Sequence, residues 1–141
     1  VWNALWGAES GANIGSTTAM VFGQIVAVIG LIATLFWSMA IFRVEDGLSP
    51  EMSRTVFDLG NFTFATQWIA IGGFLLFTGI SSLQTRVFAT WIGWSSVVIA
   101  LALLVGRYFW TDQTAFGPYV LYWIWLIVIS VILFIRARAK G

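Results

Sequence analysis

The sequence predicts an all-α integral membrane protein: a bundle of four transmembrane helices with a short outer interfacial helix. The chain of 141 residues is 60% hydrophobic and only 9% charged, whereas an ordinary soluble domain carries about 25% charged residues. Four apolar stretches approach the roughly 20 residues that a helix needs to cross about 30 Å of hydrocarbon. All six acidic residues lie outside these stretches. The bilayer is therefore the expected solvent for most of the chain.

The first 17 residues are expected to form an interfacial N-terminal segment. Its opening, VWNALWG, places Val1, Trp2, Leu5 and Trp6 close together if it is helical. Aromatic and aliphatic side chains on one face are typical of a helix that lies in the headgroup region. The alternative is that these residues end a span that begins further upstream.

The transmembrane domain is expected at 18–135, with spans at 18–42, 62–83, 87–110 and 119–135, followed by a basic cytoplasmic tail at 136–141. Lys and Arg near span ends favour the cytoplasmic side. Four basic residues fall on the side of the tail and three on the other, so both chain ends are predicted inside, in the cell inner (plasma) membrane. The nine Trp fall near span ends, as expected for aromatic belts.

The outer interfacial helix is predicted between the first two spans, in LSPEMSRTVFDLGN. Ser49 is a good N-cap, Pro50 suits the first helical position, and Glu51 favours the helix dipole. Gly60 is the expected stop. This helix is predicted to lie along the membrane surface.

Small residues predict how the spans pack, because they let membrane helices approach closely. We expect this at Gly23, Ala27 and Gly30 in the first span, Gly73 in the second, and Gly93 and Ser96 in the third. The fourth span has almost no small face, and its bulky residues are candidates for contact with lipid, a partner subunit or an isoprenoid-like ligand: Tyr122, Trp123, Trp125 and Phe134.

Three polar side chains are predicted within the spans. Gln24 and Gln67 each require a hydrogen-bonding partner in hydrocarbon, so we expect them to link helices in two separate layers. The alternative is that they are polar stations on a conduction path. Arg107 either extends its side chain outward to the interface or pairs with Asp58 or Asp112.

Composition argues against most chemistry. The chain has no His and no Cys, so the usual haem and metal ligands and activated nucleophiles are missing. It also has no mid-membrane carboxylate of the kind that proton-coupled carriers use. A net charge of +1 offers no field for nucleic acid. We therefore expect no enzyme, no catalytic or metal site and no nucleic-acid partner, and we predict no cofactor.

The stretch RVFATWIGWSS at 86–96, the apolar run after it and a last span ending in RARAK resemble small multi-pass bacterial membrane proteins of unknown function. In those proteins a basic turn leads into a Trp-Leu-Gly-Trp-like helix start, as at Trp91, Ile92, Gly93 and Trp94. The resemblance covers the C-terminal half, and the proline that often precedes this Trp is absent. It implies no functional residue.

The leading hypothesis is a non-catalytic accessory or scaffold subunit of a larger bacterial membrane complex, whose partners are membrane lipid and other membrane protein subunits. One alternative is a small oligomeric channel or carrier, which would use the small-residue faces and the two glutamines. The other is a protein that binds lipid, quinone or carotenoid by stacking on Trp and Tyr.

Overall fold

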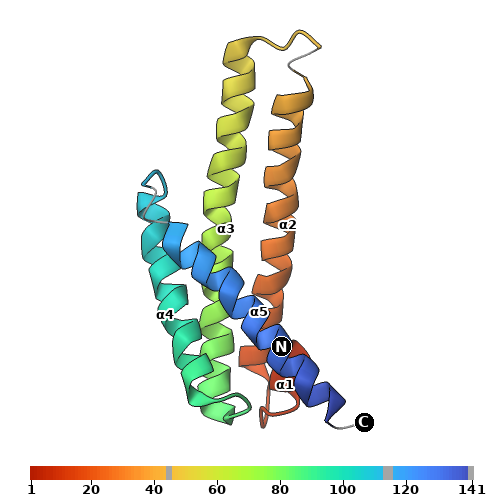
Figure 1. Ribbon diagram of the computed structural model, residues 1–141, viewed down its shortest axis with the longest axis vertical. Helices are drawn as coiled ribbons and strands as arrows, with labels where there is room; N and C mark the ends of the chain where they lie inside the picture. Colours follow the sequence, from red (N-terminus) through yellow and green to blue (C-terminus); the bar gives the residue numbers. More distant parts are fainter. Residues whose placement is uncertain (44–45, 113–115, 140–141) are drawn as a thin grey trace.

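The computed structural model describes residues 1–43, 46–112 and 116–139, and every regular element in those ranges is helical. Four helices are long and apolar enough to cross a membrane (Figure 1): α2 (Ile14–Phe42), α3 (Pro50–Thr85), α4 (Thr90–Gly106, continued by the 3-10 turn η1, Arg107–Phe109) and α5 (Gly117–Arg138). A short helix, α1 (Trp2–Trp6), precedes them. The predicted all-α bundle of four transmembrane helices is confirmed, and the chain is a multi-pass membrane protein.

Helices α2 and α3 form a long antiparallel hairpin that extends past one end of the other helices (Figure 1). The face of α2 that meets α3, here called the inner seam, consists of residues 16, 19, 23, 26, 30, 33, 37 and 40. This alternation of three and four residues keeps one face turned toward a partner helix. A methyl group added at Gly30 would lie 2.6 Å from the Gln67 side chain, and one at Gly73 would lie 2.6 Å from the Phe22 ring. Close packing at Gly30 and Gly73 is confirmed, whereas a methyl group at Gly23 would lie at an ordinary 3.6 Å from the Phe74 ring.

Ala27 does not belong to this contact. Its side chain is exposed, whereas Val26 is half-buried and Ala33 fully buried. The prediction for Ala27 is wrong because a four-residue step from Gly23 leaves the seam, which continues through Val26 instead. Ala27 lines a groove beside α5.

The predicted outer helix is the first part of α3, not a separate surface element. Its start is correct, since the Ser49 side chain accepts a hydrogen bond of 3.2 Å from the Met52 amide and Pro50 is the first helical residue. Gly60, however, lies inside the helix. A methyl group there would lie 2.5 Å from the Trp37 ring, so this glycine provides room for the indole and does not end the helix.

Helix α4 packs against the other side of α3 after a short turn in which Arg86 adopts a left-handed conformation, with φ of 53°. A methyl group at Gly79 would lie 2.8 Å from the carbonyl oxygen of Gly93. Ser96 is fully buried at the same level and would lie 3.1 Å from that methyl group. The predicted close packing at Gly93 and Ser96 is therefore confirmed.

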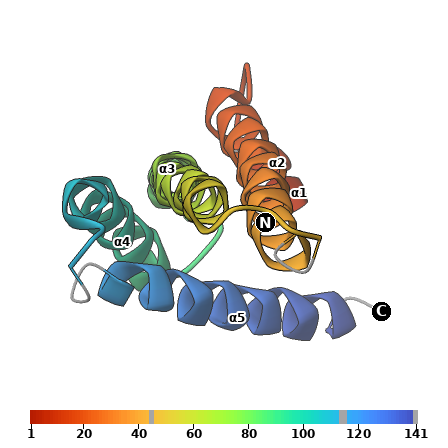
Figure 2. The ribbon, with the colours of Figure 1, turned by 90° about the horizontal axis from the view of Figure 1, so that it is seen from above.

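Helix α5 crosses the row formed by α2, α3 and α4 obliquely, as both views show (Figures 1 and 2). Tyr122 and Trp125 are buried in the core, whereas Trp123 and Phe134 are exposed. The predicted partner or lipid face is thus wrong for the first pair. An isolated helix pattern cannot separate bulky residues that fill the space above α3 from those that point outward.

The remaining boundaries shift by a few residues. Helix α2 begins at Ile14, within the predicted N-terminal segment, and α5 continues to Arg138, within the predicted tail. Residues 140–141 of that tail lie outside the described residues. The end of α5 is held by Arg136, whose guanidinium donates a 2.6 Å hydrogen bond to the carbonyl oxygen of Val87. Both described chain ends lie toward the same end of the bundle (Figure 1).

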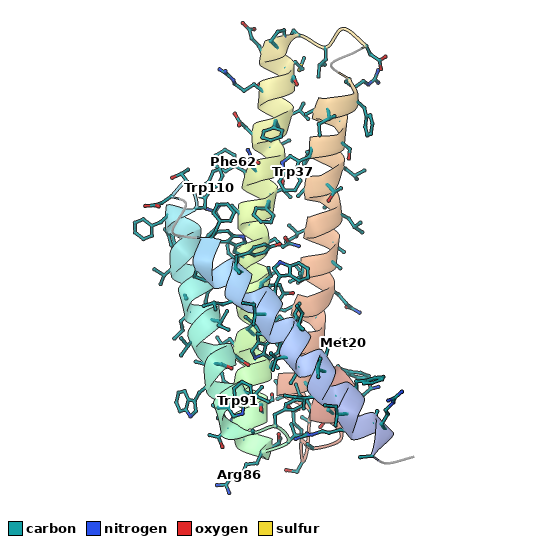
Figure 3. The ribbon with its side chains drawn as sticks, in the orientation of Figure 1. Met20, Trp37, Phe62, Arg86, Trp91 and Trp110 are labelled. Carbon is teal, nitrogen blue, oxygen red and sulfur yellow. The ribbon has the colours of Figure 1, made fainter. Side chains whose placement is uncertain are left out.

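Aromatic residues mark the ends of α4. Trp91 lies near its start, and Trp110 follows its end and contacts Phe62 with ring centroids 5.3 Å apart (Figure 3). Trp37 lies near the level of Trp110 (Figure 3). Since α4 with η1 has 20 residues, it is about 30 Å long, which is one hydrocarbon thickness. The tip of the hairpin extends past the end of α4 and η1 (Figure 1).

Candidate functional site

The hairpin tip, defined as residues 38–42 and 50–61, presents apolar side chains that no helix of the described chain covers. The most exposed are Met39, Ile41, Phe42, Met52, Phe57 and Leu59. A hollow of about 500 Å³ opens between the two helices and is lined by Ala40, Ile41, Ser53, Arg54 and Phe57. Polar groups flank it, including an ion pair between Arg43 and Asp46 at 3.7 Å. The tip is therefore an amphipathic surface.

Two side-chain hydrogen bonds join α2 and α3 at the tip. The indole N–H of Trp37 donates to the Asn61 side chain at 3.1 Å, and the Ser53 hydroxyl donates to the Ala40 carbonyl oxygen at 3.3 Å. Neither contact is predicted by the sequence pattern. For the Trp37–Asn61 hydrogen bond, the one signal in the sequence is the pair Gly60–Asn61. A glycine leaves room for an indole ring, and the next side chain can accept a hydrogen bond from the indole N–H.

An open groove lies between α2, α3 and α5 and has a volume of about 510 Å³. Its walls are rich in aromatic rings: Trp37, Phe64, Tyr119, Tyr122 and Trp123. The rings of Phe64 and Tyr119 meet edge to face, with centroids 5.1 Å apart. Gln67 lines the groove, and its amide nitrogen donates to the Val26 carbonyl oxygen at 2.7 Å. The predicted helix-linking hydrogen bond of Gln67 is confirmed.

Gln24 differs from Gln67. It lies on the exposed side of α2, and no described residue makes a hydrogen bond to its carboxamide. The prediction that it links two helices of this chain is wrong, because its position lies outside the inner seam. The two glutamines therefore do not line one path.

Arg107 starts η1 at the end of α4 and is half-buried. Its Nε atom is buried without a hydrogen-bond partner, and the structure gives no ion pair between Arg107 and Asp58. The alternative of a pair with Asp58 is therefore not seen among the described residues. The position of Arg107 at the end of the span is compatible with a side chain that extends outward to the interface.

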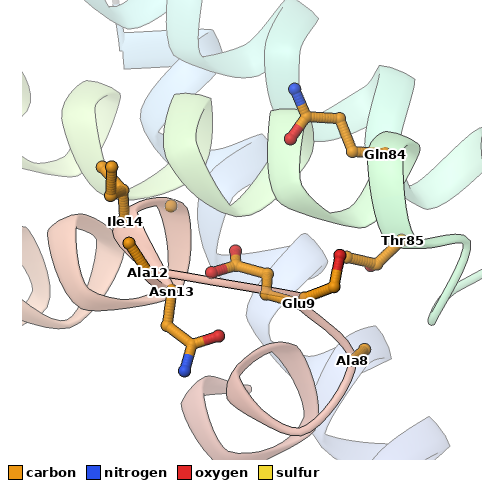
Figure 4. Close-up of a pocket in the computed structure, with 9 residues that line it drawn as sticks. Ala8, Glu9, Ala12, Asn13, Ile14, Gln84 and Thr85 are labelled. Carbon is orange, nitrogen blue, oxygen red and sulfur yellow. The ribbon is translucent and has the colours of Figure 1, made fainter.

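At the opposite end of the bundle, a polar pocket of about 310 Å³ lies between the N-terminal segment and the end of α3 (Figure 4). Glu9 accepts hydrogen bonds from the Ser16 amide at 2.9 Å and the Ser16 hydroxyl at 3.0 Å. Its carboxylate thus caps the first turn of α2, where free amides and the helix dipole favour an anion. The sequence analysis treated Glu9 only as an acid outside the spans.

The polar side chains that line this pocket include Glu9, Asn13, Gln84 and Thr85. Glu9 is engaged in the cap, and the Asn13 side chain points away from the Glu9 carboxylate (Figure 4). The described residues contain no group of three or more acidic, His or Cys side chains that could hold a metal ion. The hydrogen bonds between Glu9 and Ser16 connect the N-terminal segment to the start of α2.

The sequence matches no protein-family model, and comparisons with curated proteins and with solved structures gave no match.

Proposed function

We propose that this chain is a non-catalytic accessory or scaffold subunit of a larger membrane complex, and that the hairpin tip is its docking surface. The observation that carries the proposal is the exposed apolar surface of the tip beyond the end of α4. Outside the hydrocarbon, lipid tails no longer solvate such side chains. A contiguous apolar patch with a polar rim then favours a protein partner.

The tip has the features of a preformed interface. Trp37 and Ser53 hold its two helices together through the bonds to Asn61 and the Ala40 carbonyl, so little conformational entropy is lost when a partner binds. The hollow beside Phe57 can receive a side chain of that partner. With the basic end of α5 cytoplasmic, as the positive-inside rule favours, the tip lies on the outer side of the inner membrane.

The test is purification from the native membrane in mild detergent, with identification of chains that co-purify in stoichiometric amount. Phe42→Asp should remove the partner, because it places a charge in the apolar patch. Phe109→Asp is the matched control, since Phe109 is also exposed, at 63% against 75% for Phe42, but lies at the end of η1, outside the tip. A monodisperse protein that brings no second chain, or equal loss with both variants, would contradict the proposal.

The aromatic groove supports a second candidate function, the binding of a membrane amphiphile such as a lipid, quinone or carotenoid. Aromatic rings and the Gln67 carboxamide suit a flat or long apolar molecule with a polar end. Organic extraction and absorbance of the purified protein would identify such a ligand. Ala27→Trp should displace it by filling the groove, whereas Val98→Trp on the exposed face of α4 should not.

A channel or carrier has less support. Gln67 is bonded within the α2–α3 pair, and Gln24 faces away from it. Solute flux in liposomes that contain only this chain would support a channel or carrier function.

A further inference from the structure

The side of α2 that faces away from α3 carries a second regular pattern. We call it the outer seam: Thr17, Val21, Gln24, Val28, Leu31 and Leu35, spaced four, three, four, three and four residues apart. The aliphatic members are 45–68% exposed. Because the same alternation forms the inner seam with α3, α2 has the geometry to pack against helices on two sides.

Gln24 lies near the middle of the membrane. Phe22 of α2 packs at Gly73 of α3, and the adjacent Gly72 would place a methyl group 3.4 Å from the carbonyl oxygen of Ala100. Ala100 is the middle of the 20-residue segment Thr90–Phe109. Gln24 is therefore about 15 Å from either end of a 30 Å slab, too far for its short side chain to reach the headgroups.

This depth makes Gln24 the decisive residue of the outer seam. Aliphatic side chains are nearly indifferent between lipid tails and another helix. A carboxamide in hydrocarbon without hydrogen bonds is strongly unfavourable, and no described residue supplies a bond to Gln24. The side chain requires a hydrogen-bonding group at the same depth on another helix.

We propose that this group is Gln24 of a second copy of the chain, in a parallel dimer formed along the outer seam. Two copies inserted with the same topology place this residue at one depth. A carboxamide is both donor and acceptor, so two of them satisfy each other across a twofold axis. The seam fits a pair: Val21 and Val28 take the positions where β-branched residues favour dimers, and Leu31 takes a leucine position.

The dimer would form along the middle of α2, whereas the proposed docking surface is the hairpin tip, so each can be refuted without the other. The 141 residues contain no Cys, and single cysteines can therefore be placed in them without other changes. Val21→Cys and Val28→Cys should form disulfide-linked dimers on oxidation of proteoliposomes that contain only this chain. Val98→Cys is the control, since Val98 is 62% exposed on α4, close to the depth of Val21, but lies outside the outer seam.

The role of the carboxamide is tested by dimer dissociation, measured by energy transfer between labelled chains as lipid is added. Gln24→Leu should weaken the dimer about tenfold, the loss expected for two hydrogen bonds between membrane helices. Gln24→Asn should retain most of the affinity, because it keeps an amide. Neither change removes a side-chain hydrogen bond within the described chain, so circular dichroism should show both variants folded.

Cross-linking at Val21 and Val28 no stronger than at Val98 would overturn the inference, as would unchanged dimerisation of Gln24→Leu. Reaction with a membrane-soluble thiol reagent in native membranes then separates the remaining cases. Protection of Val28→Cys but not of Val98→Cys would mean that a different chain covers the outer seam. Equal labelling would mean that the outer seam faces lipid.

Discussion

Replacement of Gly60 by Ala tests the most unexpected feature of the fold, a glycine in the interior of α3. Alanine is the better helix former by about 1 kcal/mol, so the substitution should stabilise any helix in which the site is open. Here the new methyl group would lie 2.5 Å from Cδ1 and 2.6 Å from Nε1 of the Trp37 ring. The ring must move, and its hydrogen bond to Asn61 is lost or weakened.

The two contributions can be compared. Overpacking of a tight contact costs about 1–3 kcal/mol, and loss of a hydrogen bond costs about 0.5–1.5 kcal/mol. Against a gain of about 1 kcal/mol from helix propensity, the net result is destabilisation by about 2 kcal/mol. Gly23→Ala is the matched control, because its methyl group would lie at an ordinary 3.6 Å from the Phe74 ring. That variant should be neutral or more stable by up to about 1 kcal/mol.

The assay is unfolding of the purified protein in mixed micelles of SDS and mild detergent, followed by circular dichroism. Gly60→Ala should unfold at a lower SDS fraction than the parent chain, and Gly23→Ala at the same or a higher one. Hydrogen exchange should show slow amides on both sides of Gly60, because α3 is continuous there. A stabilised Gly60→Ala variant, or rapid exchange at Gly60, would refute the close contact and restore the glycine as a helix end.

Three further predictions concern contacts between elements. Glu9→Ala should destabilise the protein by about 1 kcal/mol through loss of the cap on α2, and limited proteolysis should then cut faster between α1 and α2; unchanged cleavage would show that the cap does not hold this segment. Gln67→Leu should cost about 0.6–1.7 kcal/mol, the range for hydrogen bonds between membrane helices, in the same SDS assay, and an unaltered midpoint would argue against the bond to Val26. Arg136→Met should release the end of α5 and increase hydrogen exchange there, whereas Arg138→Met should not, because Arg138 lies over the Phe134 ring of its own helix; equal effects would exclude Arg136 as a specific anchor.

The contrast between Gly60 and Gly73 shows how far local patterns reach. Both are glycines in α3, and each receives an aromatic ring from α2. Gly73 lies within an apolar stretch, so sequence reasoning assigned it to packing. Gly60 follows a cap, a proline and two acids, which together are typical of a short surface helix, and its role depended on Trp37, 23 positions earlier in the chain. The two glutamines also differ in a way that local sequence does not predict. Gln24 lies one residue away from the inner seam, and its depth in the membrane does not show which helix lies opposite its side chain.

The sequence by itself determined the solvent, the number of spans and the general character of each helix. Apolar length, charge position and capping residues are properties of neighbouring residues, and a bilayer turns them directly into transmembrane helices. Only the tertiary structure decided that Tyr122 and Trp125 are buried while Trp123 and Phe134 are exposed, that Glu9 caps α2, and that Gln24 has no partner among the described residues. These outcomes depend on the rotation of each helix about its axis and on which helix lies beside it. In lipid, no difference in hydrophobicity between the inside and outside of the bundle sets that rotation.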